Sequence, residues 1–191
     1  ASSTAEMVTE LIQYFSDRTK LTPLEADALL AGIVIDTKSF SLKTGARTFQ
    51  AASYLKKAGA NTTTIRQLYQ DDLSLFVEKA DVVSSAHIEN GIAVSFCPPR
   101  SRSPRLIAAQ AADTLLGIRG VKASFVLCEE NGQIIISGRS LGEINVQMIL
   151  EGLDGGGHAT MAGAQIRGVS LEDASKALIE RLKKMGMLDQ H

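Results

Sequence analysis

The first part of the chain repeats apolar positions with the period of an α-helix. Ser3 stands three residues before Glu6, a helix-capping pattern, and apolar residues follow at helical spacing. A second capping pattern, Thr22-Pro23-Leu24-Glu25, begins a helix that we expect to stop at Asp36. Two further helices are predicted at about residues 44–59 and 63–69. Residues 1–80 are therefore expected to be mainly helical.

The pattern changes near residue 80. Residues 81–88 and 92–96 read as strands joined at Asn90-Gly91, and residues 123–127 and 133–137 as strands joined at Asn131-Gly132. We also predict helices at residues 105–116, at about 145–150 and after 170, and a short strand at 164–166. Strands that alternate with helices are typical of a layered α/β fold. The sequence thus predicts a helical part, residues 1–80, followed by an α/β domain with a mixed sheet, residues 81–191.

Composition narrows the class of protein. Hydrophobic residues make up 45% of the 191 residues and charged residues 21%, an ordinary globular balance. The net charge of −1 lacks the basic excess of proteins that track long nucleic acid, so a phosphorylated substrate is expected to be small. Cys97 and Cys128 lack metal-ligand spacing and are interpreted as buried free thiols of a reducing compartment. No apolar run approaches the roughly 18 residues that a membrane span needs.

A glycine-rich segment carries the clearest chemical signal. It reads Asp154-Gly155-Gly156-Gly157-His158. Three glycines allow close approach and positive φ, so such a loop can point backbone N–H groups at an anion, and His158 adds a side-chain donor. The alternative is a flexible turn with an incidental histidine.

A second candidate lies at a strand end, in Ser137-Gly138-Arg139-Ser140. Ligand sites of α/β folds cluster at strand ends, and the guanidinium of Arg139 suits phosphate oxygens. The alternative is a solvated arginine. Asn145 can cap the helix that it begins or contact a ligand. Arg139 together with the glycine-rich segment makes phosphate binding the preferred interpretation.

Asp36 ends an apolar segment, where a carboxylate is costly unless it is paired or binds metal. Oxygen ligands suit Mn²⁺ or Mg²⁺. The alternative is that Asp36 ends the helix or strand and pairs with Lys38 or Arg47. No second cluster of metal-ligand residues is visible in the sequence. The basic segment 100–105 is interpreted as a solvated connection rather than a phosphate-steering loop.

Several of these motifs together resemble one family. Residues 36–49 resemble the last metal-ligand motif of DHH phosphoesterases, in the form typical of GdpP-type cyclic-di-AMP phosphodiesterases of bacteria. Residues 136–140 and 144–147 resemble the substrate strand and following helix of the DHH-associated domain, and Gly155-Gly156-Gly157-His158 its signature loop. The resemblance extends from Ala1 to at least Gln165.

The resemblance implies two lobes, one holding two Mn²⁺ ions and one binding the nucleotide. Asp36 would be a metal ligand. The phosphate side would comprise Arg139, Ser140, Asn145, Gly156, Gly157 and His158. The implied reaction is metal-assisted hydrolysis of cyclic di-AMP to linear diadenylate. The other metal-ligand motifs of the family, an early His with two Asp and an Asp-His-His triplet, are absent, so no complete catalytic set is expected in this chain.

The resemblance also sets expectations for the parent protein. The chain is expected to be the C-terminal part of a membrane-anchored protein, on the cytoplasmic face and attached through N-terminal segments. Residues 1–80 are expected to expose apolar surface, and a homodimer is possible. The alternatives are a stand-alone DHH nuclease of short oligonucleotides or phosphatase of adenosine bisphosphate, and a non-catalytic nucleotide-binding module.

Overall fold

The computed structural model describes residues 1–15, 20–70, 72–99 and 101–189. Arg100, part of the basic segment, lies outside these ranges. The chain divides into two compact units, Ala1–Gln70 and Asp71–His191. None of the helices in the described ranges is both long and apolar enough to cross a membrane.

The first unit is helical, as predicted. Its elements are α1 (Thr4–Tyr14), α2 (Pro23–Asp36), α3 (Ala46–Lys57) and α4 (Thr62–Leu68). The capping box at the start of α2 is complete, because Thr22 and Glu25 bond each other's backbone N–H groups. At α1, Ser3 accepts from the N–H of Glu6 at 3.0 Å, as expected.

The carboxylate of Glu6 does not reach back to the cap residue, however. It accepts from the N–H of Ser2 at 2.8 Å, from the hydroxyl of Ser2, and from Thr48 on α3 at 2.9 Å. Burial raises the pKa of Glu6, but these hydrogen bonds outweigh burial and hold the pKa below its usual value of 4.5. An ionised Glu6 therefore ties α1 to α3.

Many large apolar side chains of the first unit are exposed, as the sequence analysis expected. Its small core gathers on α2, α3 and α4 around Ile33, Leu55 and Ile65. The exposed apolar side chains are those of Met7, Val8, Leu11, Tyr14, Phe15, Leu24, Ile35, Leu42, Phe49, Leu68 and Tyr69.

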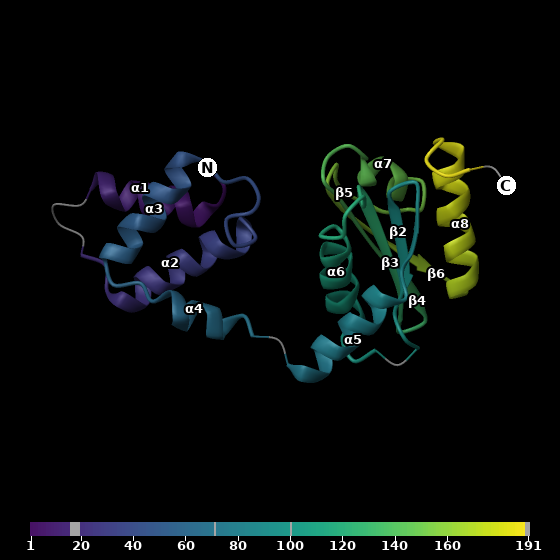
Figure 1. Cartoon of the computed structure of the whole chain (residues 1–191), viewed down its shortest axis with the longest axis horizontal. Helices are drawn as coiled ribbons and strands as arrows, with labels where there is room; N and C mark the ends of the chain where they lie inside the picture. Colours follow the sequence, from purple (N-terminus) through teal and green to yellow (C-terminus); the bar gives the residue numbers. More distant parts are fainter. Residues whose placement is uncertain (16–19, 71, 100, 190–191) are drawn as a thin grey trace. The chain divides into compact units, whose positions relative to one another are not determined.

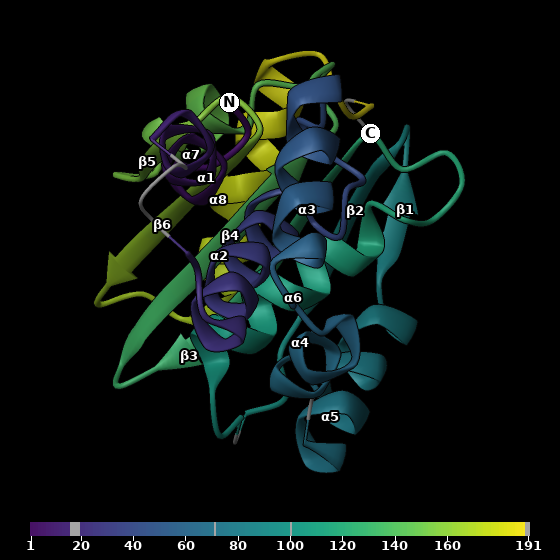
Figure 2. The same ribbon diagram turned by 90° about the vertical axis from the view of Figure 1, so that its left-hand side faces the viewer.

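The second unit is an α/β domain built on a six-stranded mixed sheet, which confirms the predicted fold class. Its elements are α5 (Leu73–Ser84), β1 (His87–Glu89), β2 (Ile92–Phe96), α6 (Pro104–Leu115), β3 (Ala123–Glu130), β4 (Gln133–Ser140), α7 (Val146–Glu151), β5 (Gly156–His158), β6 (Met161–Arg167) and α8 (Leu171–Lys184). The strand order is β1-β2-β3-β4-β6-β5, with β2 and β3 parallel and the other pairs antiparallel. Figure 2 shows the long strands β3 and β4 side by side.

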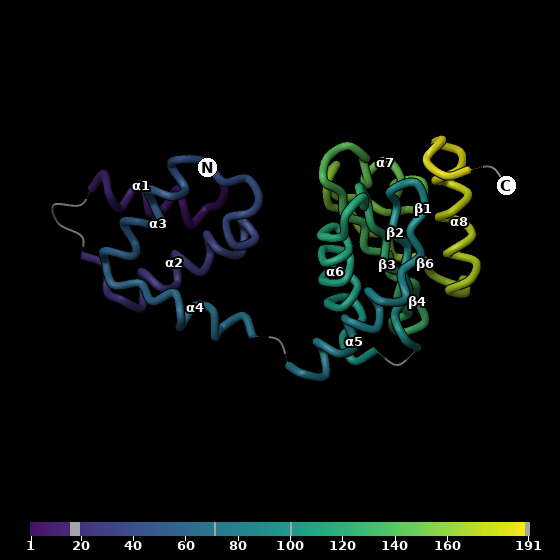
Figure 3. The backbone as a smooth tube through the Cα atoms, in the orientation of Figure 1, coloured from purple at the N-terminus to yellow at the C-terminus, as the bar shows by residue number. Residues whose placement is uncertain are grey.

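The structure corrects the interpretation of residues 81–88. A strand was predicted there, but Asp81 to Ser84 form the last turn of α5, and strand β1 covers only His87–Glu89. The chain can be followed from α5 into β1 and β2 in Figure 3. Helix α5 packs on α6 and buries Val82, which is 1% exposed. The boundary expected near residue 80 therefore falls inside a helix of the second unit, and the two compact units part at Gln70 instead.

Helices cover the sheet unequally on its two faces (Figure 1). On one face, α7 and α8 close a core with residues such as Phe125, Ile136 and Leu178. On the other face, α5 packs on β2, and α6 packs over β3 and β4, around Val126. The second face continues past α6 onto β6 and β5, where Met161, Gly163 and Gln165 of β6 are exposed. That uncovered half holds the candidate site.

The structure also corrects the interpretation of the cysteines. Cys97 and Cys128 form a disulfide, with Cα atoms 4.8 Å apart, rather than two free thiols. They meet because β2 and β3 run parallel with Phe96 beside Leu127, so the next residue of each strand is also a neighbour. Both cysteines are buried under α6.

Candidate functional site

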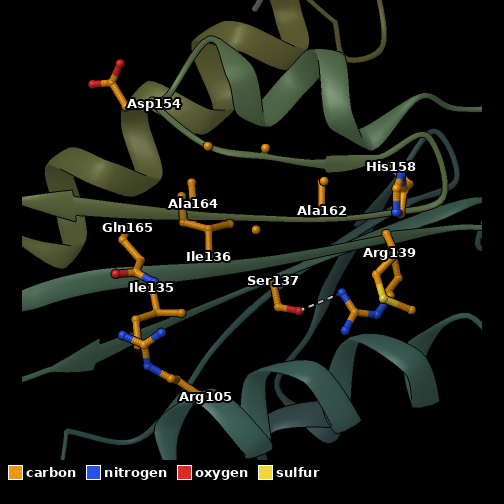
Figure 4. A pocket seen from close by; sticks show the side chains of 15 residues that line it. Arg105, Ile135, Ile136, Ser137, Arg139, Asp154, His158, Ala162, Ala164 and Gln165 are labelled. Carbon is orange, nitrogen blue, oxygen red and sulfur yellow. Dashed lines mark hydrogen bonds between the residues drawn. The ribbon is translucent and has the colours of Figure 1, made fainter.

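The candidate site is a cavity of about 690 Å³ over strands β4, β6 and β5. Strand register arranges its residues in rows. Met161 of β6 pairs with Arg139 of β4 on one side and with His158 of β5 on the other. With strands roughly 4.8 Å apart, the Cα atoms of Arg139 and His158 are about 10 Å apart. Figure 4 shows both side chains at the same end of the cavity.

The next row lies two residues along each strand, on the same face. Gly163 of β6 pairs with Ser137 of β4 and with Gly156 of β5. This second row contains only small residues, so it is a hollow beside the charged first row. The cavity therefore presents two cationic or donor side chains next to an open space, an arrangement suited to a phosphate ester.

Arg139 is held in a fixed orientation. Its Nη1 donates to the hydroxyl of Ser137 at 3.0 Å and to the carbonyl of Gly138 at 2.9 Å. Its Nε lies 3.2 Å from Asp113 Oδ1 of α6, and the Arg139 side chain is only 11% exposed. The Nε makes no hydrogen bond of good geometry, so the contact with Asp113 is ionic. These contacts fix the orientation of the buried guanidinium, so its donors need no reorientation when an anion binds. This favours tight anion binding.

The three consecutive positions are occupied by glycine for different structural reasons. A Cβ on Gly155 would lie 2.6 Å from the carbonyl oxygen of Gly163, and one on Gly157 would lie 2.5 Å from that of Met161. Gly157 also has φ of 146°, which other residues rarely adopt. A Cβ on Gly156 would meet nothing within 4 Å. Packing thus explains Gly155 and Gly157, whereas the open space at Gly156 faces the cavity.

The glycine-rich segment is not the free loop that the sequence suggested. Gly156–His158 form the edge strand β5 and pair with β6. The backbone N–H groups of an edge strand alternate between its partner and its open side, so they do not converge on one anion as a free loop allows. The close approach of Gly155 and Gly157 to β6 is what draws the segment into the sheet.

The structure brings together four of the six predicted substrate residues, Arg139, Gly156, Gly157 and His158. Ser140 is buried, accepts from the N–H of Gly142 at 2.9 Å, and does not line the cavity. Asn145 caps α7 by accepting from two backbone N–H groups at its start, which is the structural alternative weighed for it.

Asp36, the predicted metal ligand, lies in the first unit as the last residue of α2, and it is exposed. The segment after it is strained, because Lys38, Ser39 and Phe40 all have positive φ, between 45° and 65°. Each such residue costs on the order of 1–2 kcal/mol, and strain of this kind clusters at functional segments. Arg47, one of the two pairing partners considered for Asp36, bonds Glu10 instead.

The described residues do not fit a two-manganese site. Within them, no group of three or more His, Cys, Asp or Glu side chains is placed to hold a metal ion. A single exposed carboxylate cannot supply the several oxygen ligands that Mn²⁺ requires. The described residues alone therefore cannot hold the two ions of a metal-assisted hydrolysis.

Sequence reasoning missed Gln165, which lines the cavity, and Asp113, which holds Arg139. It considered Arg105 only within the basic segment 100–105, interpreted as a solvated connection, whereas Arg105 lines the cavity. Side chains alternate between the two faces along β4 and β6, and this alternation could have placed Gln165 on the face of Arg139. That inference required the register between the two strands, which the sequence does not give. Arg105 and Asp113 come from α6, whose placement over β4 no local pattern predicts.

Comparisons with known proteins agree with the fold and the motifs. The DHHA1 domain family matches residues 89–184. The chain is 48% identical, over 95% of its length, to the cyclic-di-AMP phosphodiesterase GdpP of Geobacillus thermodenitrificans, and covers 28% of that protein. It is 34% identical, over 96% of its length, to a membrane protein–large ribosomal subunit bL9 fusion protein of Onion yellows phytoplasma, and covers 22% of it.

Among solved structures, an exopolyphosphatase-related protein from Bacteroides fragilis superposes with a TM-score of 0.85 at 25% identity, covering 96% of this chain and 57% of that one. The chain thus spans less than a third of the length of these two curated relatives. Because the DHHA1 match takes in half of the chain, the chain belongs to the DHHA1 family, the DHH-associated domain that its motifs resemble.

Proposed function

We propose that this chain binds a phosphate group of a nucleotide, and that the complete protein uses this site to hydrolyse cyclic di-AMP to linear diadenylate. The observation that carries the proposal is the row formed by Arg139, Met161 and His158 beside the hollow at Gly156. The similarity to a named cyclic-di-AMP phosphodiesterase supports the choice of substrate.

The chemistry assigned to this chain is binding and orientation. Arg139, with its Nη1 and Nε already engaged, retains the N–H groups of Nη2 for a phosphate oxygen. His158 donates from the opposite strand, so the phosphate is held from two sides. The hollow at Gly156 allows the phosphate and its ester oxygen to approach the backbone. Such positioning fixes the scissile bond relative to a nucleophile supplied elsewhere.

Hydrolysis in the complete protein needs groups that the described residues lack. We propose two Mn²⁺ ions as its cofactor, with Asp36 as one ligand contributed by this chain. We also propose a membrane-anchored parent with this domain on the cytoplasmic face. The similarity to a phytoplasma protein named as a membrane protein supports the anchoring.

The test is calorimetric titration of the 191-residue chain with linear diadenylate. Each charge-assisted hydrogen bond to phosphate contributes on the order of 1.5–3 kcal/mol, so Arg139→Ala should weaken binding roughly tenfold to a hundredfold. Arg167→Ala is the matched control, because Arg167 also belongs to the sheet but bonds Gln133 and does not line the cavity. Equal affinity of the wild type and Arg139→Ala would reject the site.

A further inference from the structure

The cavity continues beyond the phosphate row and its hollow. A third row, two residues further along the same face, pairs Ile135 of β4 with Gln165 of β6. Arg105 of α6 lines the cavity too, and Figure 4 shows it with Ile135 and Gln165 at the end opposite Arg139 and His158. This end is too far from the first row for a phosphate to touch both.

The third row differs from the first in its chemistry. Ile135 is 7% exposed and supplies an apolar floor. Gln165 is exposed, and its amide has no hydrogen-bond partner among the described residues, so its donor and acceptor are both available. The Nε of Arg105 is bound to Glu130 at 2.6 Å, which fixes the plane of its guanidinium. An apolar floor, a free amide and a fixed guanidinium plane are the groups that recognise a nucleobase.

The spacing of the rows fits a nucleotide. Gln165 lies four residues along β6 from Met161, about 13 Å at roughly 3.3 Å per residue. That distance is comparable to the span from the phosphate of a nucleotide to the far edge of its base. The hollow between them, at Gly156 and Gly163, takes the ester oxygen of the phosphate together with the sugar attached to it. A Cβ on Gly163 would make only an ordinary contact, 3.4 Å from Ile136 O. Packing therefore requires neither glycine of the middle row.

We propose that the Ile135–Gln165 row is a base subsite that selects adenine. A glutamine amide can donate to N7 and accept from the N6 amino group of adenine, whereas guanine presents two acceptors, O6 and N7, on the same edge. Gln165 thus becomes a specificity-determining residue, with the guanidinium of Arg105 stacking beside the base. The inference rests on the proposed function, because the phosphate row places the nucleotide.

The experiment is calorimetric titration of the full chain with linear diadenylate and with linear diguanylate. The wild type should prefer diadenylate, and Gln165→Ala should weaken diadenylate binding by about tenfold while leaving diguanylate nearly unchanged. Gln147→Ala is the control, since Gln147 bonds Glu151 on α7, outside the cavity. Gln165 is exposed, so thermal unfolding of Gln165→Ala should match the wild type.

The outcomes separate the two proposals. If Arg139→Ala weakens both ligands but Gln165→Ala leaves their affinity ratio unchanged, or if the wild type shows no preference, the base subsite is wrong and the phosphate site stands. If Arg139→Ala also changes nothing, the proposed function fails as well. A preference that disappears only in Gln165→Ala supports the subsite.

Discussion

Gly156 and Gly157 are adjacent, yet the structure predicts opposite consequences for the same substitution. In Gly157→Val, the Cβ would stand 2.5 Å from Met161 O and 2.6 Å from Ala162 Cα. The backbone there has φ of 146°. A side chain in so sparsely populated a region costs about 1–3 kcal/mol, and overpacking adds about 1–3 kcal/mol.

The expected melting temperatures follow from these costs. A loss of about 2 kcal/mol, the lower end, should lower the melting temperature of Gly157→Val by roughly 4–8 °C in a chain of this size. Gly156→Val should change stability by no more than about 0.5 kcal/mol, because its Cβ meets nothing within 4 Å and strands accept β-branched residues. Its added methyl groups would instead fill the hollow that the phosphate needs.

The assay measures thermal unfolding and linear diadenylate binding for both variants. Gly156→Val should melt like the wild type and bind at least about tenfold more weakly, the loss of one charge-assisted hydrogen bond. The reasoning is refuted if Gly156→Val binds normally, or if it is destabilised as much as Gly157→Val. In the second case Gly156 would serve packing, and the hollow would not be a ligand site.

Four further outcomes are expected. Asp113→Asn should weaken diadenylate binding, because Asp113 holds Arg139. A double-mutant cycle with Arg139→Ala should give a coupling free energy of roughly 0.5–2 kcal/mol between the two residues, whereas no coupling is expected if Asp113 acts independently of Arg139. The pKa of Glu6 is lowered in the folded state, so ionised Glu6 stabilises the fold at pH values above the unfolded pKa near 4.5. This contribution is lost as the pH falls through the folded pKa. The free energy of unfolding of Glu6→Gln should therefore depend less on pH in that acid range than that of the wild type. The Cys97–Cys128 disulfide closes a separation of 31 residues, so reductant should lower the free energy of unfolding by about 3–4 kcal/mol and expose two alkylatable thiols by mass spectrometry. The chain alone, supplied with Mn²⁺ and cyclic di-AMP, should form no linear diadenylate by chromatography, and turnover would contradict the absence of a metal site within the described residues.

The elements that the sequence predicted well are those with local causes. The capping box at Thr22 and the cap at Asn145 mark helix starts that the structure contains. The hairpins at Asn90-Gly91 and Asn131-Gly132 also form, because positive φ at these turn residues is a local property. Short-range signals of this kind need no knowledge of the rest of the fold.

The predictions that the structure corrects are those in which segments distant in the sequence determine the local structure. The β-branched residues Val82 and Val83 favour a strand locally, but packing of α5 on α6 keeps them helical. The disulfide between Cys97 and Cys128 depends on parallel pairing of β2 and β3, which a crossover through α6 brings about. Neither result follows from a window of neighbouring residues.

The site was predicted in part for the same reason. Arg139 and the glycine-rich segment were found as separate motifs, each with a chemical argument of its own. What the sequence could not supply was the register that puts Met161 between Arg139 and His158. Without that register, Gln165 has no reason to be linked with a phosphate site four residues away.

The uncovered half of the sheet is itself an argument for a ligand. Helix α6 shields β3 and β4 but leaves Met161, Gly163 and Gln165 of β6 exposed on the same face. A sheet face without a covering layer leaves apolar area in water, and glycines within a strand weaken it. Gly163 and Gly156 lie side by side in this face although packing requires neither. Their cost to the strand is offset only if something needs the space above them, and a sugar-phosphate between Arg139 and Gln165 would occupy that space.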